Sequence, residues 1–389
     1  MNKTTLDLQA LKTPCFILNF ETLEKNVKVL QDAIAMYYPN TIIGYSFKTN
    51  SLKYVCNYMK EKGFFAEVVS ADEYLLAKEI GFESKKILYN GIAKNETTFK
   101  EAIEKGAIIN IDSTKEIDWA IKYKAKSIGL RVNIDMEKYC PGETTTENSG
   151  GRFGFSYENG DFKRVLDKLK NHDIEVSGIH MHCSTKTRSI NVYDKISQKA
   201  IEIIEKYNLR LNYVDIGGGF FGGVPGKVDF FDYFKVISKN IEKHNYLNLI
   251  IEPGASLIAS CFDYLVSVSD VKQTTYNTFV ITNGTRLHID PFFRKENYDF
   301  NLQNKKAQKI KKQIICGNTC MENDRILTLI DKEKIEIEDL IKFNKVGSYT
   351  MCFSPLFITY FPNIYLYRNG MYEIIMRKWT EKEYLQGMV

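Results

Sequence analysis

The sequence predicts an α/β protein built from a TIM-like (β/α)8 barrel and a second, mostly antiparallel β-domain. Between about residues 25 and 270, eight short Val- and Ile-rich runs alternate with segments whose apolar residues recur at helical spacing, and this alternation is typical of a (β/α)8 barrel. Farther along, Val-, Ile- and Tyr-rich runs follow one another without long helical segments. We therefore expect a barrel over residues 25–270 and a β-domain formed by residues 1–24 and 271–389.

Each barrel element follows from a local pattern. The expected strands are residues 41–45, 66–69, 86–89, 107–111, 127–132, 175–182, 213–216 and 247–251. The expected helices are residues 21–38, 52–62, 71–80, 96–105, 113–124, 161–170, 193–207 and 231–243. Gly81 and Gly106 follow helices, and Asp112-Ser113 precedes one as an N-cap pair. The polar stretch 140–151 is expected to be an insertion.

The β-domain is expected to contain six strands in its C-terminal part, at residues 264–271, 277–282, 313–316, 325–330, 346–353 and 365–376. The run Thr13–Leu18 has the same character. We expect this run to join the β-domain rather than the barrel.

Composition excludes several classes of function. The net charge is +5, from 53 basic and 48 acidic residues whose signs are mixed along the chain, so we expect no nucleic-acid surface. The most basic stretch, residues 304–312, is interpreted as solvated, with an acidic partner as the alternative. No run is long and apolar enough to predict a membrane span. The eight cysteines lack paired short spacings, which favours a reducing, cytoplasmic location without zinc or disulfides.

The first candidate for chemistry is Lys48, in Tyr45-Ser46-Phe47-Lys48-Thr49-Asn50 at the end of the first barrel strand. A lysine there lies in the mouth of the barrel, where desolvation favours the neutral amine. A neutral amine can bond covalently to an aldehyde. A snorkelling surface lysine is the alternative, and the other strand ends decide between the two.

Polar residues gather at the C-terminal ends of the other expected strands, which is where a barrel places its active site. They are Glu67, Arg131, His180, His182, Gly217–Gly219 and the segment Glu252-Pro253-Gly254. An amine, an imidazole that can stack, glycine N–H groups that can approach a phosphate and a carboxylate for a pyridine nitrogen together suit pyridoxal phosphate. The set therefore predicts a pyridoxal-phosphate site.

Two other sites are considered and disfavoured. Gly217–Gly222 spells G-x-G-x-x-G, but Val224-Pro225-Gly226 follows where a dinucleotide-binding helix should begin. His180, His182 and Cys183 could suggest a metal, yet neighbouring residues of a strand point to opposite faces. We predict no metal site.

The ordered motifs resemble the fold-type III pyridoxal-phosphate decarboxylases, the group of ornithine, diaminopimelate and arginine decarboxylases, whose architecture is similar to that of alanine racemase. The resemblance covers nearly the whole chain. The motifs that carry it are Tyr45–Asn50, Glu67–Ser70 with Glu73, Arg152–Gly154, His180–Thr185, Asp215–Phe220, Glu252–Gly254, Gly317–Cys320 and Gly347–Tyr349.

The resemblance implies roles for individual residues. Lys48 would hold the cofactor aldehyde, and Cys320 of a second subunit would protonate the α-carbon as general acid. Cofactor contacts would come from Lys48, Glu67, Arg131, His182, Thr185, Gly217, Gly218, Gly219, Glu252, Gly254 and Tyr349. Tyr349 and Cys320 would both be carried by the β-domain. The protein would be a homodimer with shared active sites. Its partner would be a small-molecule substrate, an amino acid.

Departures from the family pattern concern the substrate. Diaminopimelate enzymes usually carry arginines where this chain has Ala255 and Asp290, and an acid where it has Met321. Arg286 or Arg294 could replace the arginine missing at Ala255. We therefore expect diaminopimelate to be a poor substrate. A distal amine would be met by residues among Asp290, Met321, Glu322 and Asp324, which favours an ornithine- or lysine-like, pathway-specific or D-amino acid.

Two alternative functions stay open at this point. A racemase of this fold usually sets an arginine against the pyridine nitrogen, so Glu252 favours decarboxylation over racemisation. A non-catalytic pyridoxal-phosphate carrier would be a single barrel without the β-domain and its Cys320. The main prediction is a decarboxylase.

Overall fold

The computed structural model describes residues 7–303 and 307–389. The chain divides into two compact units, one of Asn26–Ser256 and one that combines the residues up to Lys25 with Leu257–Val389. The division falls after Ser256, whereas the sequence places the boundary near residue 270. Residues 257–270 thus lie in the second unit, because β11 (Phe262–Gln273) pairs with strands of the β-domain.

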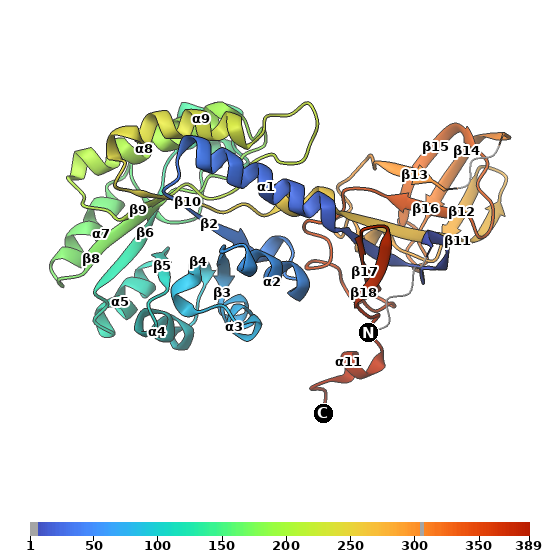
Figure 1. Cartoon of the computed structure of the whole chain (residues 1–389), viewed down its shortest axis with the longest axis horizontal. Coiled ribbons are helices and arrows are strands. Elements are labelled where there is room, and N and C mark those ends of the chain that lie inside the picture. Colours follow the sequence, from blue (N-terminus) through green and yellow to red (C-terminus); the bar gives the residue numbers. More distant parts are fainter. Residues whose placement is uncertain (1–6, 304–306) are drawn as a thin grey trace. The chain divides into compact units, whose positions relative to one another are not determined.

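The first unit is a closed barrel of parallel strands (Figure 1). Its strands are β2 (Thr41–Ser46), β3 (Phe65–Ser70), β4 (Ile87–Ala93), β5 (Ile108–Ile111), β6 (Ser127–Asn133), β8 (Glu175–His180), β9 (Tyr213–Asp215) and β10 (Asn248–Ile251). Their order is β5-β4-β3-β2-β10-β9-β8-β6, and pairing of Asn110 with Gly129 joins β5 to β6. The short strand β7 (Phe155–Ser156) pairs with the outer end of β6. The predicted (β/α)8 barrel is confirmed.

Helices cover the outside of the barrel (Figure 1). They are α1 (Phe20–Tyr37), α2 (Lys53–Glu61), α3 (Ala71–Ile80), α4 (Glu96–Glu104), α5 (Thr114–Lys122), α7 (Asp161–Lys170), α8 (Ile190–Tyr207) and α9 (Phe230–Ile241), with the single turns α6 (Met136–Tyr139) in the barrel and α10 (Ala255–Ile258) at the division. Ser70, Asn95 and Ser113 begin α3, α4 and α5, because each side chain accepts a hydrogen bond from the backbone N–H three residues later.

The barrel interior is packed with side chains rather than open. Leu88, Tyr213 and Ile250 form a buried cluster against Ile42, Phe65 and Ile108. Tyr213 needs the space left by Gly178, where a Cβ atom would lie 2.2 Å from the tyrosine ring. A large side chain on one strand thus fills the gap over a glycine on its neighbour, which is how small barrels pack their layers.

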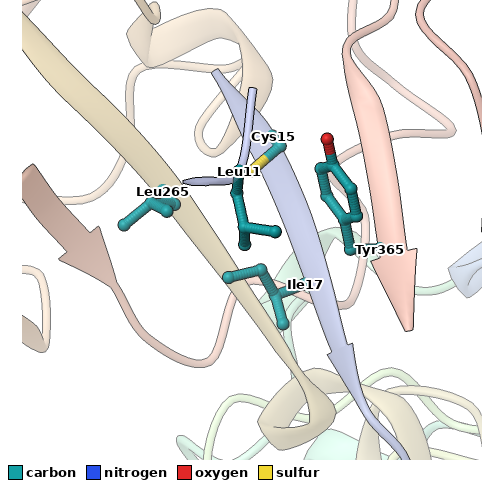
Figure 2. Close-up of a cluster of buried hydrophobic side chains, with 5 residues drawn as sticks. All are labelled: Leu11, Cys15, Ile17, Leu265 and Tyr365. Atoms are coloured by element: carbon teal, nitrogen blue, oxygen red, sulfur yellow. The ribbon is translucent and has the colours of Figure 1, made fainter. Parts of the chain in front are cut away.

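The second unit is a nine-stranded, mostly antiparallel sheet. Its strands are β1 (Cys15–Asn19), β11, β12 (Thr278–Thr282), β13 (Phe300–Leu302), β14 (Lys309–Cys316), β15 (Arg325–Glu333), β16 (Leu340–Phe343), β17 (Asn363–Arg368) and β18 (Met371–Met376), followed by the helix α11 (Glu381–Leu385). Strand β1 pairs antiparallel with β11 and parallel with β17. Around it, Leu11, Cys15, Ile17, Leu265 and Tyr365 form a buried cluster (Figure 2). The run Thr13–Leu18 therefore joins this domain, as predicted.

Two predicted strands of the β-domain differ in the structure. Residues 346–353 form turns, and the strand lies earlier, at β16. The run 365–376 is a hairpin rather than one strand, because Asn369 and Gly370 adopt positive φ angles of 51° and 75° and reverse the chain.

Two expectations on surfaces concern particular segments. Residues 304–306 of the basic stretch lie outside the described residues, and residues 309–312 begin β14 with mostly exposed side chains. Among the described residues, no helix combines the length and the apolar character that crossing a membrane requires.

Candidate active site

A cavity of about 930 Å³ lies at the C-terminal ends of the barrel strands. Six of the residues singled out from the sequence line it: Lys48, Glu67, Arg131, His180, His182 and Glu252. They come from distant parts of the sequence, and the parallel barrel brings their strand ends together. The rule that strand ends carry the chemistry thus leads to one cavity.

Lys48 and Glu67 form an ion pair at the cavity wall. The chain leaves β2 at Ser46 and makes one 3-10 turn over Phe47–Thr49, which carries Lys48. The Lys48 Nζ atom lies 2.7 Å from Glu67 Oε2, and the Ser46 hydroxyl donates to the same oxygen at 2.6 Å. The Glu67 side chain is 1% exposed and that of Lys48 36%. A buried acid therefore holds an amine whose side chain can still be reached.

Three carboxyl groups converge at the cavity: Glu67 and Glu252, which line it, and Asp215 beside Glu252. Burial raises the pKa of Glu252 well above its ordinary value, and the neighbouring Asp215 and Glu67 raise it further. Burial likewise raises the pKa of Asp215 to about 7. Near neutral pH the three carboxyl groups together therefore tend to retain a proton. A positively charged ligand atom beside them would stabilise their ionised forms.

His180 lies beside Glu252, with 3.4 Å between its Nε2 atom and Glu252 Oε1. The geometry is not that of a hydrogen bond, and neither ring nitrogen has a hydrogen-bond partner among the described residues. The ligand atoms of His180, Asp215 and Glu252 lie within 4.8 Å of one another, a spacing that a metal ion could also use. The absence of a metal stays a prediction.

His182 is held as a neutral ring. Burial, together with the charges of Arg131 and Lys48, lowers the pKa of His182 to about 3. Its Nδ1 atom accepts a hydrogen bond from the Gly218 N–H at 3.2 Å. The ring packs on Gly217, where a Cβ atom would lie 2.3 Å from Nδ1 and where φ is +73°. Glycine is thus needed there both for space and for conformation.

Several predicted cofactor residues are not on the cavity wall. The Gly217 N–H donates to Asp215 Oδ1 at 2.8 Å, so two N–H groups of the glycine loop are used within the protein. Thr185 donates to the carbonyl of Glu143 at 3.0 Å. Gly254 packs on Thr49 and Ser46. Whether these residues contact a cofactor stays a prediction.

Two arginines line the cavity and differ in their surroundings. Arg131 lies 3.4 Å from Asp112 Oδ2, and its guanidinium covers the ring of Phe153. Arg152 also stacks on the Phe153 ring, with 4.2 Å from its guanidinium carbon to the ring centre. It lines the cavity and forms no ion pair with any described residue. The wall therefore offers one guanidinium with no acidic partner in the described part of the chain.

The predicted insertion 140–151 supplies another part of the wall, through Thr144–Thr146 and Gly150–Gly151. Glu143 ties it to the start of α8, because its carboxylate accepts hydrogen bonds from Thr187 at 2.6 Å, from Asn191 at 3.1 Å and from Ser189. The insertion is thus an ordered part of the barrel mouth.

Sequence reasoning missed two residues of the site, Asn90 and Asn110. Asn90 is in β4 and lines the cavity, and Asn110 is in β5. Both are buried, with 1% of each exposed. Both lie near the C-terminal ends of barrel strands, the third and the fourth. The rule that led to Lys48 and Glu67, that polar residues at these ends form the site, could therefore have found them as well.

The remaining predicted residues belong to the β-domain. Cys320 is exposed, and Tyr349 is 38% exposed in a turn. Glu322 is exposed and Met321 is partly buried. Their roles stay predictions.

The two buried acids of that set already have partners. Asp290 forms an ion pair with Arg286 at 2.8 Å and accepts the backbone N–H groups of Arg294 and Lys295. Asp324 accepts hydrogen bonds from the side chains of Thr285 and Thr319. Both carboxylates therefore stabilise loops of the β-domain, which gives a physical reason why they are poor candidates for pairing a substrate amine.

The residues present fit pyridoxal phosphate. Lys48 offers an amine at the cavity wall, His182 offers a neutral ring, and His180 has unsatisfied ring nitrogens in a buried position. The acidic group of Glu67, Asp215 and Glu252 suits a protonated pyridine nitrogen, because such a nitrogen brings the positive charge that the group lacks.

Comparisons with known proteins agree with this cofactor. Residues 21–259, more than half of the chain, match the family "Pyridoxal-dependent decarboxylase, pyridoxal binding domain". The chain is 23% identical to the diaminopimelate decarboxylase of Aquifex aeolicus over 89% of its own length and 84% of that relative. It is 26% identical to a probable chloroplastic diaminopimelate decarboxylase of Oryza sativa, over 72% of the chain and 59% of that relative.

A solved structure shows the same fold. The diaminopimelate decarboxylase of M. jannaschii in co-complex with L-lysine is 22% identical, with a TM-score of 0.86 over 97% of this chain and 92% of that one.

These comparisons contradict the expected substrate. The relatives are chiefly diaminopimelate decarboxylases, so the predicted preference for an ornithine- or lysine-like, pathway-specific or D-amino acid is wrong. The prediction relied on the absence of arginine at Ala255 and Asp290, on Met321 in place of an acid, and on the acids Asp290, Glu322 and Asp324. Asp290 and Asp324 are occupied within the β-domain, and Arg152 shows that a guanidinium can reach the cavity from another loop.

The cofactor and the reaction type follow from the family match and from the cavity together. The protein uses pyridoxal phosphate and is a carboxy-lyase. With its barrel, its antiparallel second domain and its lysine-bearing cavity, the chain belongs to the fold-type III pyridoxal-phosphate-dependent decarboxylases.

Proposed function

We propose that this protein decarboxylates diaminopimelate. The observation that carries the proposal is the similarity to diaminopimelate decarboxylases along 84–85% of the length of relatives from Aquifex aeolicus and Archaeoglobus fulgidus. In this reaction the substrate loses one carboxyl group as CO₂ and gains a proton at the same carbon, which gives lysine. L-Lysine is the ligand named for the solved M. jannaschii relative.

The residues around the cavity have separate tasks. When bound, pyridoxal phosphate supplies the electron sink that accepts the electron pair left by CO₂. Lys48 would hold the cofactor, and Glu67 keeps the Lys48 amine at the wall through its 2.7 Å contact. His182, which stays neutral, would lie against the ring. Glu252 would keep the pyridine nitrogen protonated.

The substrate has a second carboxylate, and the cavity offers a cation for it. Arg152 lies on the wall without an acidic partner among the described residues. A guanidinium can bind a carboxylate through two parallel hydrogen bonds. Arg152 is therefore our candidate for the carboxylate that is not lost.

We also propose that the active form is a homodimer, in which Cys320 of the second subunit protonates the α-carbon. The family resemblance implies this arrangement. It agrees with the exposure of Cys320. Among the described residues, Cys183 is the single thiol on the cavity wall. The eight cysteines are all free, which agrees with a reducing cytoplasm.

A substrate panel tests the proposed function. CO₂ release would be measured from meso-diaminopimelate, L-lysine, L-ornithine and L-arginine at equal enzyme concentration. We expect kcat/KM for meso-diaminopimelate to exceed the others by about 10- to 100-fold, since a charge-assisted hydrogen bond to the second carboxylate is worth about 1.5–3 kcal/mol. A higher kcat/KM for any of the other three would contradict the proposal.

A further inference from the structure

Asn90 connects the two carboxyl groups that line the cavity, those of Glu67 and Glu252. Its Nδ2 atom donates one hydrogen bond to Glu67 Oε1 at 3.3 Å and another to Glu252 Oε1. Asn90 and Glu67 are each 1% exposed, and Glu252 is 5% exposed. Both hydrogens of one buried amide are thus used to connect the acid beside Lys48 to the acid proposed for the pyridine nitrogen.

The direction of this amide is set by a chain of side chains behind it. The Tyr213 hydroxyl donates to Asn110 Oδ1 at 2.8 Å, and Asn110 Nδ2 donates to Asn90 Oδ1 at 2.8 Å. Each oxygen accepts from the preceding residue, so each NH₂ group faces the next one. In the reversed arrangement the Asn90 oxygen would face two carboxyl groups, which would be repulsive.

The connection matters because these acids are buried together. Like charges at short distance favour the protonated form of one of them. Burial raises the pKa of Glu252, and the charges of Asp215 and Glu67 raise it further. An amide N–H stabilises the ionised carboxylate without adding a positive charge that would compete with a cationic ligand. Asn90 can therefore keep Glu252 available to a pyridine nitrogen.

We propose that Asn90 is a positioning residue that orients Glu252 and favours its ionised form for the pyridine nitrogen of the cofactor. Asn110 fixes the direction of the Asn90 amide through its hydrogen bond to Asn90 Oδ1, and Tyr213 fixes that of Asn110 in the same way. The proposal rests on the role proposed for Glu252, and it is independent of the identity of the substrate.

The test uses the holoenzyme and its apoprotein, and two measurements that need no substrate. One is the dissociation constant of pyridoxal phosphate, from titration of the apoprotein followed by absorbance. The other is the pH at which the absorbance of the bound cofactor changes. Thermal unfolding of each apoprotein shows whether the variant is folded.

Asn90→Leu keeps most of the side-chain volume and removes the hydrogen bonds to Glu67 and Glu252, together with the one that Asn90 accepts from Asn110. We expect the dissociation constant to rise about tenfold or more and the spectral transition to move upward by about one pH unit, because Glu252 then protonates more readily. Asn90→Asp adds a fourth carboxyl group to Glu67, Asp215 and Glu252 and should weaken binding further. Tyr213→Phe should change both quantities in the same direction but less.

Asn159→Asp is the matched control. Asn159 is exposed, and its side-chain oxygen accepts from the Asp161 N–H, a contact that aspartate retains. It should leave both measurements unchanged. Wild-type values of both in folded Asn90→Leu would overturn the proposal. If that variant does not fold, Tyr213→Phe decides the question by the same criterion.

Discussion

The amine of Lys48 and the carboxylate of Glu67 lie 2.7 Å apart at the cavity wall, and Ser46 donates to the same carboxylate oxygen. Strands β2 and β3 are neighbours, with Ser46 opposite Glu67 in register. The pair is therefore fixed by backbone pairing and not only by its charges. An amine placed in this way is pre-oriented before any ligand enters.

Lys48→Ala should abolish the visible absorbance of the bound cofactor, since no other described lysine lines the cavity. Absorbance spectra of purified protein after incubation with pyridoxal phosphate would show this. Lys53→Ala, at an exposed lysine in α2, should keep the wild-type spectrum. A retained band in Lys48→Ala would mean that another amine binds the cofactor.

Arg152→Gln should lower kcat/KM for diaminopimelate by about 10- to 100-fold, mainly through KM, because the charged contact to the second carboxylate is lost. The dissociation constant of the cofactor should stay as it is. Arg164→Gln, at an exposed arginine of α7, is the control. Unchanged steady-state constants for Arg152→Gln would remove Arg152 from the substrate site.

Two inactive variants should restore activity when they share a dimer. Lys48→Ala and Cys320→Ala would be produced together, and random pairing leaves one intact site in half of the dimers. We expect about a quarter of the wild-type activity, measured as CO₂ release. Activity no higher than that of either variant alone would argue against a site shared between subunits.

The β-domain should lose stability in mild acid because of His288. Its side chain is buried beside Tyr264, with 2.7 Å between His288 Nδ1 and the hydroxyl, and burial lowers the pKa of His288 to about 4. The unfolded chain takes up the proton first, near pH 6.5. The stabilisation is therefore complete above about pH 6.5 and is lost as the pH falls toward 4.

Urea unfolding at several pH values measures this effect, with His288→Phe as the variant that cannot titrate. Between pH 6.5 and 5 the unfolding free energy of the wild type should fall by about 2 kcal/mol relative to the variant. Parallel pH curves for the two proteins would show that His288 does not titrate between the folded and unfolded states.

The barrel could be predicted because its signals are local. Helix starts such as Ser70 and Ser113 and the short β-branched strands each leave a mark within a few residues. The hairpin turn at Asn369-Gly370 also carries a local signal, which the continuous apolar run around it concealed.

The roles of the residues that sequence reasoning missed depend on contacts between distant residues. Asn90 and Asn110 look like ordinary polar residues of a strand, and their importance arises from Tyr213, Glu67 and Glu252. The prediction of the substrate was wrong for a related reason. Asp290 is an acid in the sequence, but its ion pair with Arg286 makes it part of a loop.

The central place of β1 in the β-domain affects how the chain is made. Residues 15–19 pair with residues 262–265 on one side and 363–367 on the other. During translation this strand emerges before both of its neighbours, and it can pair with the second one only after residue 367 has been synthesised. The barrel strands lie between β1 and its two neighbours in the sequence and can pair meanwhile, so β1 stays unpaired for longer than any barrel strand and is open to non-native pairing.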